Sequence, residues 1–110
     1  MMVLESINEG VVVVRNDQSV IMSNVVARSI LGEGIEGARV IDLFKNNNDL
    51  LEAYWEVANS KANFKEIYDV TFKSEGREMI ALDFTCLNMN NKGDIGAVLL
   101  LFHLNSVSSC

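Results

Sequence analysis

The chain of 110 residues has no proline, two cysteines, one histidine and no long apolar run. A zinc or iron–sulfur site needs several converging ligands, and one histidine with two distant cysteines is too few, so we expect no metal. Cys86 and Cys110 also make no disulfide framework, which suits a reducing compartment and favours a cytoplasmic location. The longest apolar run, residues 97–102, has the length of a strand and not the ~20 residues of a membrane span. We therefore expect no contact with a membrane.

Positive charge is also scarce. Nine Lys and Arg residues stand against fifteen Asp and Glu residues, which gives a net charge of −6. Such a chain repels phosphate backbones, so nucleic acids are excluded as partners. Apolar residues make up 49% of the chain and charged residues 22%, as in a globular protein. A chain of this length has room for one hydrophobic core, and we expect a single domain over residues 1–110.

The first part of the chain predicts a hairpin followed by a capped helix. Two β-branched runs, residues 11–14 and 20–22, flank a turn-forming segment of Asn, Asp, Gln and Ser. Ser23 or Asn24 can accept the free amide hydrogens at the start of a helix over 25–31. Gly32 then tolerates the left-handed conformation of a helix end.

Helices are also expected on either side of this hairpin unit. Residues 2–8 are a short amphipathic candidate at the amino terminus. Asp42 can cap a brief helical turn at Leu43 and Phe44, and Asp49 can cap a helix over residues 50–59. In that last helix apolar residues recur at helical spacing, with glutamates opposite.

Three strands follow, over residues 64–73, 77–88 and 94–104, separated by turns of Gly and Asn chemistry. Strands at both ends with helices between them predict an α+β domain. We expect a five-stranded antiparallel sheet with the helices packed on one face.

The last strand is apolar on both faces, because Val98, Leu100 and Phe102 alternate with equally apolar neighbours. A sheet face open to water needs polar residues, so we expect the second face to be covered by the amino-terminal helix, a partner subunit or both. We predict a homodimer. The candidates for its interface are Val3, Leu4, Ile7, Val98, Leu100 and Phe102.

The residues that could act as nucleophile, base or ligand do not form the pattern of an active site. Cys86 sits in an apolar strand with no base nearby, and His103 is interpreted as a strand-end residue and not a haem ligand. Gly32, Gly34 and Gly37 have the spacing of a dinucleotide-binding motif but follow a helix, so we consider the match accidental. We predict a protein that is not an enzyme.

A ligand cavity under the long helix is the second candidate site, although aromatic residues at helical spacing also suit a plain core. Asp83 and Thr85 interrupt an apolar strand pattern, and either face water or put polar groups into that cavity. If Asp83 points inward, a small α+β enzyme using it as an acid or base is the alternative. The pocket candidates are Leu51, Tyr54, Trp55, Asp83, Thr85, Leu99 and Leu101.

An ordered set of residues resembles the PAS domain superfamily over almost the whole chain. A glycine before the first strand, an acidic turn, an Asn that opens a helix, a Leu-Gly that ends it, and later loop residues all occur in the order usual for that family. They are Gly10, Asp17, Asn24, Leu31-Gly32, Gly37, Asp42-Leu43-Phe44 and Gly96.

The resemblance implies a sensory module of signal transduction, such as the input domain of a bacterial sensor histidine kinase in a two-component system. Separately from the resemblance, predicted structure runs from Val3 to about Leu104, so we expect one domain cut from a longer protein. It has a helix over 2–8, a core over 10–105 and a short tail over 106–110, and a small free-standing protein is the alternative. Such a module binds a small ligand or a partner and relays the signal to a covalently linked output domain. A ligand-free interaction domain is the other alternative.

Three departures from the family bear on ligands and relay. His103-Leu104-Asn105 stands where many members have Asp-Ile-Thr, which couples the last strand to an outgoing helix. No Asn-Cys-Arg-Phe-Leu segment of the light-sensing flavin branch occurs, and residues 50–59 contain no histidine. The sequence also lacks C-x-x-C-H. These absences argue against haem and a LOV-type flavin and leave the ligand open.

Overall fold

The computed structural model describes residues 9–74, 76 and 78–104. The expected helix over 2–8 and the tail over 106–110 lie outside the described residues. The interface candidates Val3, Leu4 and Ile7 lie there too, so they remain predictions.

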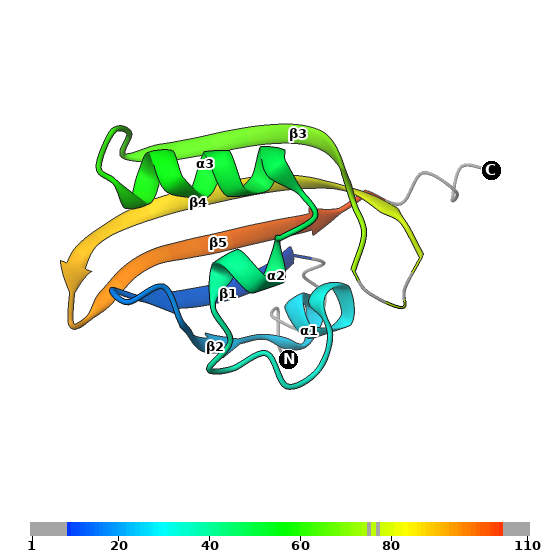
Figure 1. Ribbon diagram of the computed structural model, residues 1–110, viewed down its shortest axis with the longest axis horizontal. Helices are drawn as coiled ribbons and strands as arrows, with labels where there is room; N and C mark the ends of the chain where they lie inside the picture. The colour runs from blue at the N-terminus through cyan, green and yellow to red at the C-terminus, as the bar shows by residue number, and fades with distance from the viewer. Residues whose placement is uncertain (1–8, 75, 77, 105–110) are drawn as a thin grey trace, which may run out of the picture.

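One sheet of five antiparallel strands forms the scaffold (Figure 1). Its spatial order is β2-β1-β5-β4-β3, so the last strand of the chain is central and pairs with both β1 and β4. The predicted five-stranded α+β architecture is confirmed. The strands are β1 Glu9–Arg15, β2 Val20–Ser23, β3 Phe64–Phe72, β4 Ile80–Lys92 and β5 Ile95–His103.

Three helices lie on one side of this sheet (Figure 1): α1 Val25–Leu31, α2 Val40–Leu43 and α3 Asn48–Ala58. Two predicted helix starts were wrong. Arg39 and not Asp42 precedes α2, and α3 begins after Asn47, whose carbonyl accepts the N–H groups of Leu50 and Leu51. Asp49 thus lies in the first turn of α3, where its charge complements the helix dipole.

The β4–β5 hairpin turns later than its Asn-rich sequence predicts. β4 continues to Lys92, which pairs with Ile95, and only Gly93 and Asp94 form the loop. Their φ angles of 59° and 73° are those of a two-residue turn with both central residues left-handed. Asn90 is also left-handed, at φ 56°, and takes up the register shift between Asn88 and Lys92. The strand begins at Ile80, so Glu78 and Met79, which were expected in it, precede it.

Asn24 ties α1 to the first strand, as its predicted capping role requires. Its Oδ1 accepts the N–H of Ala27 at 2.9 Å and the N–H of Val11 at 2.9 Å. Its Nδ2 donates to the carbonyl of Glu9 at 3.0 Å. One side chain therefore satisfies two donors and one acceptor of the main chain at the point where helix and sheet meet.

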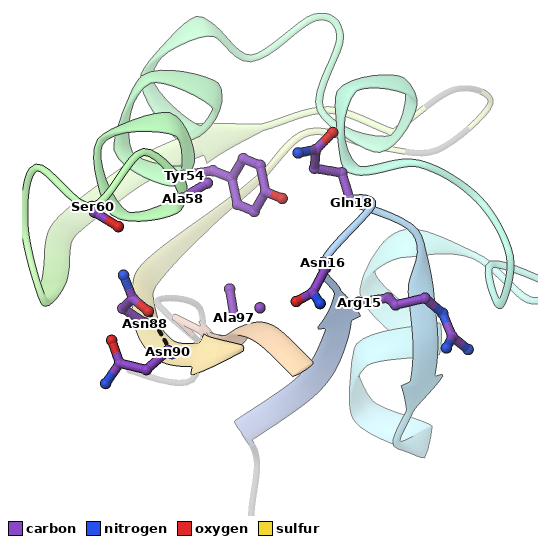
Figure 2. Close-up of a pocket in the computed structure, with 10 residues that line it drawn as sticks. Arg15, Asn16, Gln18, Tyr54, Ala58, Ser60, Asn88, Asn90 and Ala97 are labelled. Carbon is purple, nitrogen blue, oxygen red and sulfur yellow. Dashed lines mark hydrogen bonds between the residues drawn. The ribbon is translucent and has the colours of Figure 1, made fainter. Parts of the chain in front are cut away.

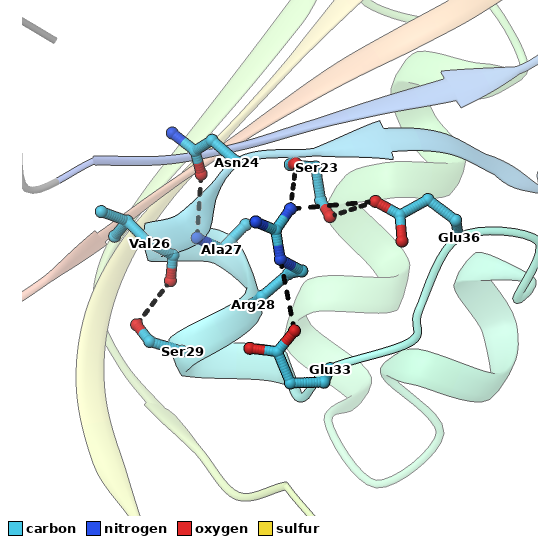
Figure 3. Close-up of polar contacts among 8 residues, drawn as sticks. All are labelled: Ser23, Asn24, Val26, Ala27, Arg28, Ser29, Glu33 and Glu36. Atoms are coloured by element: carbon cyan, nitrogen blue, oxygen red, sulfur yellow. Dashed lines mark hydrogen bonds and ion pairs between the residues drawn. The ribbon is translucent and has the colours of Figure 1, made fainter. Parts of the chain in front are cut away.

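Arg28 holds the other side of α1 (Figure 3). Its Nη1 donates to the Ser23 carbonyl at 2.6 Å, and its Nε lies 3.4 Å from Glu33 Oε1. Ser23 donates its hydroxyl hydrogen to Glu36 at 2.9 Å, which lowers the pKa of that carboxyl. The contacts to Glu33 and Glu36 position the loop that follows α1.

The core fills the space between the helices and the sheet. Phe44 contacts Phe72 and Phe84 edge to face, with ring centroids 6.0 and 5.8 Å apart. The strands contribute seven fully buried residues to this core: Val12, Val14, Leu82, Phe84, Cys86, Leu99 and Leu101. This packing defines the helix side of the sheet as its inner face.

Candidate functional site

The register of the strands assigns each side chain to a face. Cys86 pairs with Leu99, and both are fully buried on the inner face. Because side chains alternate, the neighbouring pair of Thr85 and Leu100 points to the opposite, outer face. Asp83 and its partner Phe102 lie on the same outer face.

The outer face carries an apolar stripe over the three middle strands. Val11 and Thr85 flank Leu100, and Val13 and Leu87 flank Val98. Phe102, at the end of the stripe, is 42% exposed. We call this set the outer apolar face: Val11, Val13, Leu87, Val98, Leu100 and Phe102. Three of the predicted interface residues therefore fall on one continuous surface.

The structure divides the predicted pocket residues between the two faces. Leu99 and Leu101 are buried in the inner core, whereas Asp83 and Thr85 point away from the helices. Grouping these four in one cavity is therefore corrected, because Asp83 and Thr85 pair with Phe102 and Leu100, whose side chains lie on the face opposite to Leu99 and Leu101. Leu51 and Trp55 are partly buried on α3, packed against the core.

Asp83 has a structural partner on the outer face. Its carboxylate accepts the backbone N–H of Asp69 at 2.8 Å. Asp69 is left-handed, at φ 56°, inside the register shift between Ile67 and Val70. The carboxylate thus stabilises a β-bulge in β3.

A polar pocket of about 240 Å³ lies beside the carboxyl-terminal end of α3 (Figure 2). Of the predicted pocket residues only Tyr54 lines it. The other polar lining residues come from the end of β1 and the turn after it, from the turn after α3 and from the last part of β4, so no local pattern in the sequence connects them. They are Arg15, Asn16, Gln18, Ser60, Asn88 and Asn90.

Comparison with known proteins identifies the fold. No protein-family model matches the chain, and no curated protein matches its sequence. Solved PAS domains match its structure. That of nitrogen regulation protein NR(II) from Vibrio parahaemolyticus is 15% identical with a TM-score of 0.68, over 93% of this chain and 94% of that one. The chain has the PAS fold.

Two further matches show where this fold is used. A sensory box sensor histidine kinase from Vibrio cholerae is 14% identical with a TM-score of 0.62, covering 93% of this chain and 86% of that one. The second match is the PAS domain of a LuxR-family transcriptional regulator from Burkholderia thailandensis, in complex with ethanol. It is 13% identical with a TM-score of 0.61, covering 94% of this chain and 98% of that one. These PAS domains belong to sensory and regulatory proteins.

The remaining chemical groups of this PAS fold occupy structural positions. Burial raises the pKa of the Cys86 thiol to about 12, so it stays protonated and unreactive. His103 is exposed at the end of β5, as predicted. Within the described residues no group of three His, Cys, Asp or Glu is placed to hold a metal ion. No helix in that part of the chain is long and apolar enough to cross a membrane.

Proposed function

We propose that this domain is a sensory and dimerisation module of a signalling protein and that two copies pair through the outer apolar face. The observation that carries the proposal is the continuous stripe of apolar side chains on β1, β5 and β4. The sensory role of the structurally matched PAS domains supports the proposed sensory role of this domain.

Pairing through a sheet face suits a two-fold dimer. The stripe is centred on β5, the middle strand, so the same surface of a second copy can lie against it. Removing such side chains from water contributes about 25 cal/mol for each Å² of apolar surface buried. Phe64 and Met22, which are 56% and 57% exposed, extend the apolar surface beyond the stripe.

Signal relay then follows from a shift between arrangements of the pair. A ligand or partner that binds one arrangement better raises its population, and a covalently linked output domain responds to the change. The ethanol complex of the Burkholderia thailandensis domain supports a small-molecule input. We place this module in the cytoplasm, as its cysteine usage favours.

Sedimentation velocity over a range of protein concentrations tests the pairing. The unmodified chain should form a dimer, and Leu100→Asp or Phe102→Asp should be monomeric, because each puts a charge into the proposed interface. Ile41→Asp is the matched control, since Ile41 is an apolar residue of α2 whose exposed fraction, 49%, is close to the 42% of Phe102. A monomer at the highest concentration, or an Ile41→Asp variant that dissociates as readily, contradicts the proposal.

A further inference from the structure

Three segments that are distant in the sequence meet at the polar pocket beside α3. Asn16 and Gln18 come from the β1–β2 turn, Tyr54 from α3 and Ser60 from the turn after it, and Asn88 from β4. Figure 2 shows these side chains arranged around a common space. The pocket lies on the helix side of the sheet, away from the outer apolar face, because Asn88 donates to the α3 carbonyl of Val57.

Tyr54 contributes a hydroxyl group to this pocket. The residue is only 2% exposed, and Figure 2 shows its hydroxyl directed into the space between the other lining residues. No described residue forms a hydrogen bond with that hydroxyl. The hydroxyl oxygen opens into the pocket, so it can bond water or a compound that enters the pocket.

The hydroxyl can both donate and accept. Burial raises the pKa of Tyr54, so the phenol keeps its proton at physiological pH. Its ring is fixed by an edge contact with Trp55, at 5.3 Å between centroids. The hydrogen-bonding group is therefore held in place before anything binds.

The amide groups opposite are also held in place. Asn88 Nδ2 donates to the Val57 carbonyl at 3.0 Å, and Asn88 Oδ1 accepts the N–H of Asn90 at 2.6 Å. Of the five non-glycine residues with left-handed φ in the described chain, three line this pocket: Gln18, Ser60 and Asn90. Backbone conformations of this kind cluster at ligand sites, where they position side chains.

The lining selects an uncharged ligand. It contains no carboxylate that would hold a cation. Its one cation is Arg15, whose side chain leads away from the pocket in Figure 2, and the chain's net charge of −6 disfavours anions. Amide and hydroxyl groups each offer donors and acceptors, which matches the hydroxyl groups of a polyol or sugar.

We propose that this pocket binds a small uncharged polyhydroxy compound of about the size of a monosaccharide, with Tyr54 and the side-chain amides of Asn16, Gln18 and Asn88 as its hydrogen-bond partners. A volume of 240 Å³ equals about eight waters of the liquid at ~30 Å³ each, which fits a ligand of that size. The inference does not depend on pairing through the outer apolar face, so either proposal can fail alone.

An NMR titration of the ¹⁵N-labelled chain tests the site, with glycerol, myo-inositol and D-glucose as probes. At least one probe should give saturable shifts of the Asn16, Gln18 and Asn88 side-chain amide signals. D-Glucuronate and D-glucosamine, charged compounds of similar size, should bind more weakly. Tyr54→Phe, which removes only the hydroxyl, should weaken binding roughly 3- to 10-fold, the effect of one hydrogen bond.

The controls separate the hydroxyl from general damage. Tyr68→Phe should leave the affinity unchanged, because Tyr68 is 65% exposed and bonds Glu66 outside the pocket. Asn16→Ala, at an exposed position, is a second binding variant and should weaken binding to a similar extent. Three outcomes overturn the inference: no saturable shift with any of the three neutral probes, equal binding of the charged compounds, or unchanged affinity in both Tyr54→Phe and Asn16→Ala.

Discussion

Leu99 and Leu100 are chemically identical neighbours on β5 with opposite surroundings. Leu99 is fully buried on the inner face against the helices, whereas Leu100 lies half-buried on the outer face between Val11 and Thr85. The inner leucine holds the fold together. The outer one belongs to the outer apolar face, through which we propose that two copies pair.

The largest expected difference between the faces comes from Leu99→Ser against Leu100→Ser. Leu99→Ser should lower the free energy of unfolding by about 3–5 kcal/mol, because it leaves a cavity and buries an unpaired hydroxyl. Leu100→Ser should cost less than about 1 kcal/mol in the monomer. Urea unfolding at low protein concentration measures both values. Equal costs would show that the two faces are buried alike.

A second comparison concerns how closely the helices approach the inner face. A Cβ at Gly10 would lie 2.8 Å from the Ala27 Cα, which is main chain and cannot move aside cheaply. Gly10→Ala should therefore lower the free energy of unfolding by about 1–3 kcal/mol. Gly96→Ala is the control, since its nearest contact would be 3.3 Å from the Arg15 carbonyl oxygen, and a smaller loss is expected. Thermal unfolding checks the order, and a larger loss at Gly96 would contradict it.

The link between α1 and the sheet is expected to be weaker than the core but measurable. Asn24→Ala removes the acceptor for two main-chain N–H groups and should lower the free energy of unfolding by about 1–2 kcal/mol. Asn24→Asp keeps that acceptor and loses only the donor to Glu9, so it should cost less. Chemical denaturation of the two variants would refute this account if Asp proved as damaging as Ala.

The smallest effect is expected in the β1–β2 turn, outside both faces. The Ser19 hydroxyl and N–H donate to Asp17 and hold the pKa of its carboxyl below the ordinary value of 3.8. The folded state therefore favours the ionised carboxylate, and this stabilisation is complete above the ordinary pKa and is lost as the pH falls through the lowered one. In Ser19→Ala, NMR titration of the Asp17 carboxyl should show its pKa rising towards 3.8. If the pKa of Asp17 stayed unchanged in this variant, groups other than the Ser19 hydroxyl would cause its lowering.

The sequence predicted best what short-range signals determine. Asn24 before a helix and Gly32 after it are local features, and both lie where the pattern placed them. The five-stranded antiparallel sheet with helices on one face was also predicted, and the structural matches agree with it. Helix starts were less certain, because Asn47 and Asp49 are both good capping residues and only the packing of α3 chooses between them.

The direction of the Asp83 side chain and the set of residues that line the polar pocket could be determined only from the three-dimensional fold. The alternation of β4 allows Asp83 to point to either face of the sheet. Its direction follows only once it is known which face the helices cover. The pocket combines Asn16, Tyr54 and Asn88, which are too far apart in sequence for any local pattern to connect them. Such sites depend on long-range pairing of the strands.

Isotope-filtered NOE spectroscopy tests the central claim most directly, on a mixture of labelled and unlabelled copies of the unmodified chain. The account predicts intermolecular NOEs to the methyl groups of Val98 and Leu100 and none to those of Leu99 and Leu101. Intermolecular contacts at another surface, or none at a concentration where sedimentation shows a dimer, would contradict pairing through the outer apolar face.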